Sequence, residues 1–277
     1  MKKGVGLLDR KNRILLRELV VTDFKLRYQG SVLGYIWSVL KPLFLFAILY
    51  VVFVYVLQMD RGVPHFAVTL LLGVVLWSFF TEATSNGLGS IVNRGDLIRK
   101  LNFPKYIIVI SGTISSLINL GINLLVVILF ALINGVDFTW HVLWMIPLVL
   151  ELYVFALGIA MLLSALNVKF RDTGYIWEIF LQAAFYATPI IYPLTMVMER
   201  SQKAAEILFI NPVAQIIQDA RYAMISQDAS IVRMTDLIHD WRLAIPGFII
   251  LLMVTVGVWY FSKKSKFFPV KEELDVF

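Results

Sequence analysis

Apolar residues form six long runs along the chain, and charged residues gather in the short segments between them. A helix needs roughly 20 mainly apolar residues to cross the hydrocarbon core of a bilayer, where no backbone polar group can be left unpaired. The pattern therefore predicts an all-α, polytopic membrane protein with six transmembrane helices. The predicted helices are Leu33–Leu57, Phe66–Phe80, Tyr106–Ile133, Val142–Leu166, Tyr175–Tyr192 and Leu243–Phe261.

These runs also predict how the chain is organised. Residues 1–32 form an N-terminal segment, residues 33–261 the six-helix transmembrane domain, and residues 262–277 a C-terminal tail. The second run is short, and we expect its helix to continue past Thr81.

The composition excludes several classes of protein. Of the 277 residues, 59% are hydrophobic and only 16% are charged, whereas soluble domains carry about 25% charged residues. The chain has too few charges to cover a soluble enzyme, and the absence of cysteine excludes a disulfide-stapled secreted domain.

The positive charges predict the orientation in the membrane. Nineteen of the 25 Lys and Arg residues fall in Met1–Lys41, in the C-terminal tail and in the loops on one side of the predicted helices. Because cytoplasmic loops are enriched in these residues, we expect both termini in the cytoplasm. The chain is then expected to be a multi-pass protein of the cytoplasmic membrane. The net charge of +6 then reflects topology, and nucleic-acid binding is not needed to explain it.

The segment before the first run predicts a helix that lies in the membrane surface. Leu8, Leu15, Leu16, Leu19, Val20 and Phe24 recur at helical spacing, and most of the basic residues fall on the other face. Such a helix can be a simple anchor. It can also hold an anionic lipid or contact a cytoplasmic partner, and the sequence favours neither.

Asn93–Lys105, the loop between the second and third runs, mixes basic and apolar residues. It predicts a short helix that ends before Pro104. A solvated connector has little use for the four apolar residues of this loop, so we favour docking onto a partner. Those residues are Leu97, Ile98, Leu101 and Phe103.

Residues 193–242 form a long outer segment that is too apolar for a free loop. Pro189 and Pro193 should end or kink the fifth helix, because proline lacks the amide hydrogen. Two short helices are predicted at Ala204–Ile210 and Val213–Ile225. Asn211 would cap the second helix and Pro212 would occupy its first position. We interpret both as re-entrant or surface-lying helices at an outer mouth, and a protective cap is the alternative.

Enzymatic chemistry is not visible in the sequence. No Gly-x-x-x-x-Gly-Lys-Ser/Thr phosphate loop occurs, and the three histidines are far apart with no cysteine to help them hold zinc. Glu151 and Glu178 are the only acids within the predicted spans. Glu151 is expected near mid-depth, where it could relay protons or form a structural hydrogen bond, and Glu178 is expected to reach cytoplasmic water.

Several motifs, taken in order, resemble the permease subunit of bacterial ABC exporters for lipid-linked polysaccharides, which export O-antigen and wall teichoic acid. The motifs are the surface helix, Arg27–Trp37 with Lys41-Pro42, Leu97–Pro104, Phe170-Arg171-Asp172, Pro189–Pro193 and Asn211-Pro212.

This resemblance implies partners and a substrate. Such permeases form homodimers with the conduit between protomers, and pair with two copies of a separate ATP-binding subunit. The substrate is a polymer on an undecaprenyl diphosphate carrier. ATP and Mg would belong to the partner, so no cofactor is expected in this chain.

The resemblance also implies roles for two groups of residues. The loop Asn93–Lys105 would match the helix that receives the stroke of the ATPase, and the short helices around Asn211 would match gate helices. The coupling residues would be Asp96, Leu97, Arg99, Lys100, Phe103, Arg171 and Asp172. The gate residues would be Pro189, Pro193, Asn211 and Pro212.

A substrate path follows as a hypothesis from both arguments. Lys25, Arg27 and Lys41 are candidates to hold the lipid diphosphate, because phosphate oxygens accept hydrogen bonds from cationic donors. Aromatic side chains would stack on sugar faces, although each could equally pack against lipid. These are Tyr35, Trp37, Phe185, Tyr186 and Tyr192.

Two other functions compete with polysaccharide export. A drug or small-lipid exporter of the same permease superfamily would share the topology and the need for an ATPase. A secondary transporter or channel driven by ions should show two related halves or more charges within the membrane, and neither is evident in the sequence.

Overall fold

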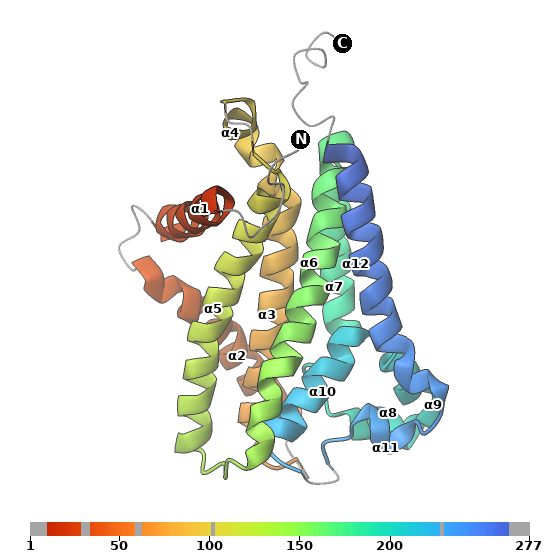
Figure 1. Cartoon of the computed structure of the whole chain (residues 1–277). Coiled ribbons are helices and arrows are strands. Elements are labelled where there is room, and N and C mark those ends of the chain that lie inside the picture. Colours follow the sequence, from red (N-terminus) through yellow and green to blue (C-terminus); the bar gives the residue numbers. More distant parts are fainter. Residues whose placement is uncertain (1–9, 29–33, 59–62, 101–102, 228–229, 266–277) are drawn as a thin grey trace.

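The computed structural model describes residues 10–28, 34–58, 63–100, 103–227 and 230–265, and within these ranges it contains helices and no strands. Four long helices stand side by side and form the bundle (Figure 1). They are α3 (Phe66–Ser90), α5 (Tyr106–Ile133), α6 (Met145–Lys169) and α12 (Ile245–Lys264).

Five helical segments among the described residues are long and apolar enough to cross a membrane, which confirms the polytopic all-α class. α5 has the predicted bounds. α3 continues ten residues beyond Phe80 to Ser90, as its expected extension past Thr81 required. α2 (Trp37–Tyr50) passes directly into a π-helical turn, Val51–Val56.

The fifth predicted run, Tyr175–Tyr192, forms a shorter helix than expected. α7 spans Thr173–Ala187, and its 15 residues reach only about 22 Å, less than the thickness of the hydrocarbon core. Thr188 is already extended, because the ring of Pro189 disfavours helical geometry in the residue before it. Pro189 therefore ends α7, which confirms that part of the prediction, whereas the predicted bound at Tyr192 was wrong.

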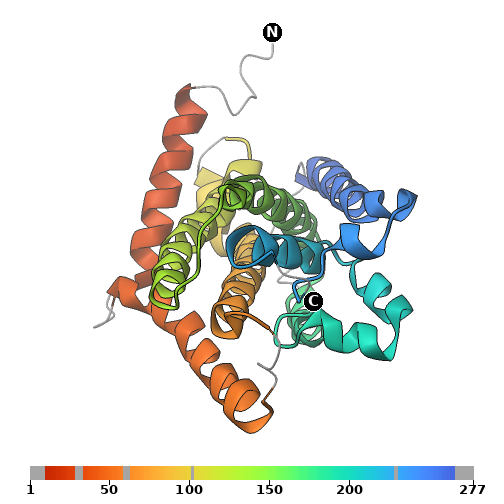
Figure 2. The same ribbon diagram turned by 90° about the horizontal axis from the view of Figure 1, so that it is seen from below.

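The predicted surface helix is α1 (Arg10–Tyr28), which lies across the outside of the bundle against α5 (Figures 1 and 2). It is tied to the loop after α3. Asp23 forms an ion pair with Arg94, and the Arg94 Nη1 donates to the Ser111 hydroxyl of α5 at 3.0 Å. α1 is thus fixed to the segment that leads directly into the short helix α4 (Gly95–Lys100).

Short helices gather at the end of the bundle opposite α4 (Figure 1). α9 (Gln202–Leu208) and α10 (Pro212–Met224) agree with the two predicted helices to within two residues at each end. α8 (Leu194–Arg200) and α11 (Met234–Leu237) were not predicted.

These short helices do not all lie at the surface. α8, α9 and α11 lie at the periphery, whereas α10 is inserted into the bundle against α6 and α3. The side chains of Ile216 and Ile217 in α10 are fully buried. α10 is therefore a re-entrant element and part of the core.

Glycine allows a close helix contact in the bundle. α6 and α12 cross at Gly158 and Gly257, and a Cβ atom at Gly257 would collide with the backbone carbonyl of Gly158. A Cβ atom at Gly158 would lie 2.8 Å from the Cα of Val254. Small residues at a membrane helix crossing let the two backbones approach, and van der Waals packing then holds the pair together.

Candidate functional site

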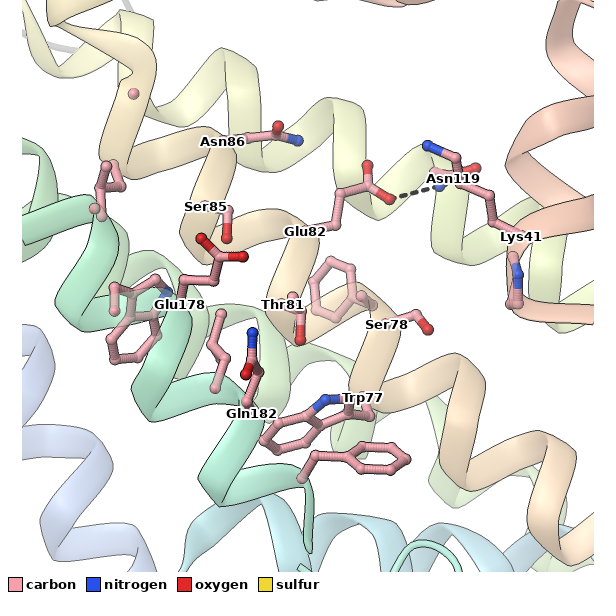
Figure 3. Close-up of a pocket in the computed structure, with 18 of the residues that line it drawn as sticks. Lys41, Trp77, Ser78, Thr81, Glu82, Ser85, Asn86, Asn119, Glu178 and Gln182 are labelled. Atoms are coloured by element: carbon pink, nitrogen blue, oxygen red, sulfur yellow. Dashed lines mark hydrogen bonds between the residues drawn. The ribbon is translucent and has the colours of Figure 1, made fainter. Parts of the chain in front are cut away.

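A cavity of about 1720 Å³ lies between α2, α3, α5 and α7 (Figure 3). Its wall on α3 is polar. Ser78, Glu82, Ser85 and Gly89 recur at helical spacing, and this stripe runs about 16 Å along one face of the helix. A polar stripe inside an apolar bundle is costly in lipid, so it indicates contact with water or with a polar ligand.

Hydrogen bonds hold this wall in place. The amide of Asn119 on α5 donates to the Glu82 carboxylate at 2.7 Å (Figure 3). The amide of Asn86 donates to the Ser116 hydroxyl at 2.9 Å. These bonds join α3 to α5 and fix the direction in which the polar groups point.

α7 forms the opposite wall. Glu178 and Gln182, one turn apart, point into the same space as the stripe on α3 (Figure 3). The indole N–H of Trp177 donates to the Thr84 hydroxyl of α3 at 3.1 Å and anchors α7 to its neighbour. The cavity therefore has two polar walls on helices that contact each other.

Aromatic side chains line the part of the cavity nearest the end of α7. The rings of Trp77 and Phe185 are 6.0 Å apart, and those of Phe185 and Tyr186 are 5.4 Å apart. Trp37 of α2 also lines the cavity. Three of the five predicted aromatic residues thus line one cavity, and Trp77 was missed.

The other two predicted aromatic residues are not part of this group. Tyr192 lies beyond the end of α7, beside a second, small hollow, and its hydroxyl donates to the backbone carbonyl of Tyr186 at 3.3 Å. The side chain of Tyr35 lies outside the described residues. Stacking on sugars stays a prediction for all five.

The structure separates the three cations predicted to bind the lipid diphosphate. Lys41 lines the cavity. Lys25 is exposed on α1 and does not line it, whereas the side chain of Arg27 lies outside the described residues. Arg171, which was predicted for coupling, also lines the cavity.

The predicted coupling residues lie at the end of the bundle that carries α4. Asp96 and Arg99 form an ion pair across one turn of α4, and Lys100 is exposed. Phe103 is half-buried against the cluster that contains Ile98. Arg171 and Asp172 are exposed in the turn between α6 and α7. Their role stays a prediction, but the short helix that it required is present.

The predicted cap of α10 is confirmed. The side-chain oxygen of Asn211 accepts from the Val213 N–H at 3.0 Å, and Pro212 occupies the first turn. The Asn211 amide also donates to the Thr188 hydroxyl at 2.9 Å. Asn211 thus joins the start of α10 to the break after α7, at which Pro189 is buried.

Arg221 of α10 is the main structural residue that sequence reasoning missed. Its side chain is 3% exposed, and it donates to the carbonyls of Thr69, Pro189 and Ile190 at 3.2, 2.7 and 2.7 Å. A Cβ atom at Gly73 would lie 2.8 Å from its Nη2, so glycine leaves room for the guanidinium. Arg221 supplies donors for carbonyls that the break at Pro189 leaves without helical partners.

Glu82 was also missed. The second run was drawn to Phe80, so Glu178 and Glu151 were taken as the only acids within the membrane helices, and that expectation was wrong. The spacing of Ser78, Glu82 and Asn86 on one helical face is the signal that could have found it. Glu151 is half-buried on α6 and does not line the cavity.

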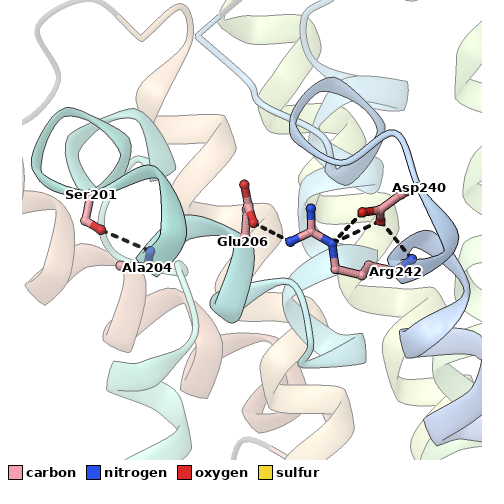
Figure 4. Close-up of polar contacts among 5 residues, drawn as sticks. All are labelled: Ser201, Ala204, Glu206, Asp240 and Arg242. Atoms are coloured by element: carbon pink, nitrogen blue, oxygen red, sulfur yellow. Dashed lines mark hydrogen bonds and ion pairs between the residues drawn. The ribbon is translucent and has the colours of Figure 1, made fainter.

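At the end of the molecule opposite α4, an ion-pair network joins α9 to the segment before α12 (Figure 4). Arg242, just before α12, donates to Glu206 of α9 at 2.6 Å and to Asp240 at 2.9 Å. The backbone N–H and the guanidinium of Arg242 lower the pKa of Asp240. The Ser201 hydroxyl caps α9 by accepting from the Ala204 N–H at 3.3 Å. Within the described residues, no cluster of His, Asp and Glu side chains could hold a metal ion.

The fold and the polar cavity are those of a membrane transport subunit, and comparison with known proteins identifies the family. Residues 15–225 match the family described as ABC-2 type transporter. The match covers well over half of the chain, so this protein belongs to that family of ABC transporter permeases.

Individual relatives are named as polysaccharide exporters. The chain is 32% identical to the O-antigen export system permease protein RfbA of Myxococcus xanthus over 74% of this chain and 78% of the relative. It is 32% identical to the O-antigen export system permease protein RfbA of Klebsiella pneumoniae over 78% of this chain and 81% of the relative. It is 20% identical to the polysialic acid transport protein KpsM of Escherichia coli over 76% and 81%.

Proposed function

We propose that this chain is the membrane subunit of an ATP-driven exporter that moves a lipid-linked polysaccharide across the cytoplasmic membrane. The observation that carries the proposal is the large cavity with polar walls on α3 and α7, built into an otherwise apolar bundle. The relatives named as O-antigen export permeases support this substrate class.

The shape and chemistry of the cavity favour a sugar polymer over an apolar drug or a small lipid. Amides and hydroxyls recur along the helices, and aromatic rings lie at one end. The hydroxyl groups of a sugar can hydrogen-bond with the amides and hydroxyls, and its flat C–H faces can stack on the aromatic rings. An apolar drug would displace water from the amides and hydroxyls that face the cavity and would offer them no hydrogen bonds in return, at a cost for each group that it covers.

A second copy of the chain would complete the conduit. Beside the cavity, α7 exposes Tyr175, Ile176, Ile179 and Phe180, each more than half exposed. An apolar face that adjoins a polar cavity fits a dimer in which the two cavities meet. The homodimer is therefore part of the proposal.

The energy for transport would come from a separate ATP-binding subunit at the end that carries α4. The chain has no phosphate loop of its own. α4 and the turn with Arg171 and Asp172 lie together at that end and fit a docking surface (Figure 1). The basic residues of α1 and of the loops support a cytoplasmic position for this end by the positive-inside rule.

The lipid carrier would bind where the basic residues meet the cavity. Lys41 and Arg171 line it, and α1 brings Lys25 to the neighbouring membrane surface. An undecaprenyl diphosphate headgroup would gain charge-assisted hydrogen bonds from such side chains. The polymer on that carrier would be an O-antigen or a wall teichoic acid.

The test is reconstitution of the chain with its ATP-binding subunit in vesicles, with ATP-dependent transfer of lipid-linked polysaccharide as the readout. Lys100→Glu reverses an exposed charge on α4 and should reduce both subunit binding and transfer by at least tenfold. Lys203→Glu makes the same change on α9 at the opposite end and should leave both unchanged. Equal behaviour of the two variants would remove the docking assignment, and transfer without the ATPase would remove the proposed function.

A further inference from the structure

The polar residues that line the cavity indicate the charge of the polymer that is exported. We infer that the exported polymer is an uncharged polysaccharide, and that polyanions such as phosphodiester-linked or sialic acid polymers are poor cargo. This inference rests on the proposed function and narrows its substrate class.

Neutral groups dominate the polar lining. Four charged side chains line the cavity, namely Lys41, Glu82, Arg171 and Glu178, so their charges sum to zero. The remaining lining residues with amide or aliphatic hydroxyl side chains are Ser38, Ser78, Thr81, Ser85, Asn86, Asn93, Asn119, Asn123, Asn167 and Gln182.

The two acids line the cavity from two different helices. Glu82 on α3 points towards Asn119 of α5, and Glu178 on α7 lies beside Ser85 (Figure 3). A carboxylate only accepts hydrogen bonds, and so do the oxygens of a phosphodiester. A polyanion would bring negative charge close to these carboxylates, and the apolar helices beside them make the repulsion stronger than it is in water.

Uncharged sugars meet the same walls without conflict. A sugar hydroxyl can donate to Glu82 or Glu178 and can accept from the amides of Asn86 or Gln182. The groups on α3 repeat at each turn, about 5.4 Å apart along the axis, so an extended polymer finds donors and acceptors all along the stripe.

The basic residues of the chain are concentrated away from the cavity. α1 carries Arg10, Lys11, Arg13 and Arg17 on the outside of the bundle, and α4 carries Arg99 and Lys100. A conduit for a polyanion would use cations along its length to attract the cargo. Two cations are enough to bind the one diphosphate of the carrier, but they cannot neutralise a polymer that carries a charge on every repeat unit.

The experiment compares two defined probes on the reconstituted complex of this chain with its ATP-binding subunit. Both probes carry undecaprenyl diphosphate. One bears a polymer of neutral hexoses, and the other bears poly(glycerol phosphate) of similar length. The measurements are probe-stimulated ATP hydrolysis and ATP-dependent transfer. We expect the neutral probe to be transferred at least tenfold faster than the polyanion.

A double variant tests whether the two carboxylates cause this preference. Glu82→Gln with Glu178→Gln keeps the shape of both side chains and removes their charge, and should raise transfer of the polyanion at least threefold. Glu199→Gln, an exposed acid of α8 outside the cavity, is the matched control and should change neither probe.

Each outcome separates this inference from the proposed function. Equal transfer of both probes, or a preference for the polyanion, overturns the inference and leaves polysaccharide export standing. A preference for the neutral probe that persists unchanged in the double variant overturns the role of the two acids. If neither probe is transferred by a complex that assembles and hydrolyses ATP, the proposed function itself fails.

Discussion

The two ends of α3 place polar groups in very different surroundings. From Phe66 to Val74 the helix is almost entirely buried against α10 and its other neighbours, and the guanidinium of Arg221 donates to its Thr69 carbonyl. From Thr81 to Ser90 the helix borders the cavity, and Glu82 and Asn86 are only partly buried.

The difference lies in what satisfies the polar groups. The hydrogen bonds of Arg221 go to backbone carbonyls and to Gln218, so protein atoms hold it on all sides. Glu82 and Asn86 have side-chain partners and also face open space. The hydrogen bonds of Arg221 fix α10 within the bundle, whereas the side chains of Glu82 and Asn86 can also bind a ligand. Polar residues on one membrane helix can therefore serve stability at one end and recognition at the other.

The largest expected effect is the loss of Arg221. Arg221→Leu leaves the carbonyls of Pro189 and Ile190 without their donor, and each such loss costs about 1–3 kcal/mol, so we expect a total of about 2–6 kcal/mol. Asn86→Ala removes a single hydrogen bond beside the cavity, where water can replace it, and should cost about 1 kcal/mol or less. Denaturation of the purified protein in detergent measures both. Equal losses for the two variants would contradict the comparison.

A smaller effect is expected where the packed region extends to α6 and α12. Gly257→Ala forces these helices apart, because its methyl group collides with the Gly158 carbonyl, and overpacking of this kind typically costs about 1–3 kcal/mol. Gly247→Ala on the same helix meets no atom within 4 Å and is the control. The melting temperatures of the two variants check this. A melting temperature of Gly257→Ala equal to that of the wild type would show that the crossing is not tightly packed.

The smallest effect is expected at the exposed network of Asp240, Arg242 and Glu206 (Figure 4). Because folding lowers the pKa of Asp240, its contribution to stability is present at neutral pH and is lost as the pH falls through the folded-state value. Asp240→Asn should therefore lower the melting temperature slightly at pH 7, and its difference from the wild type should vanish as the pH falls, which flattens the acid side of the stability profile. Melting temperatures between pH 7 and pH 3 test this, and parallel profiles for both proteins would exclude it.

Much of the fold follows from hydrophobic patterning. The bounds of α5 and the cap at Asn211 were predictable, because a long uncharged run and the Asn-Pro pair are local signals. The early end of α7 also has a local cause in Pro189, yet the apolar residues after it extended the predicted helix to Tyr192.

The site was less predictable because its key contacts join distant parts of the chain. Arg221 was counted only as a cation on the outer side, and no local pattern shows that its partners are the carbonyls of Thr69 and Ile190. Glu82 was missed because the hydrophobic run weakens before the helix ends. Trp37, Lys41 and Phe185 were assigned to the substrate path, and they do line one cavity.

The continuity of α3 has a mechanical consequence. The helix is 25 residues long, about 37 Å, contains no proline, and leads through a single 3-10 turn into α4. A helix of this kind transmits a push along its axis with little bending. A displacement of a few ångströms at the α4 end of this helix would therefore also move the carbonyl of Thr69, about 30 Å away. That carbonyl accepts a hydrogen bond from the guanidinium of Arg221.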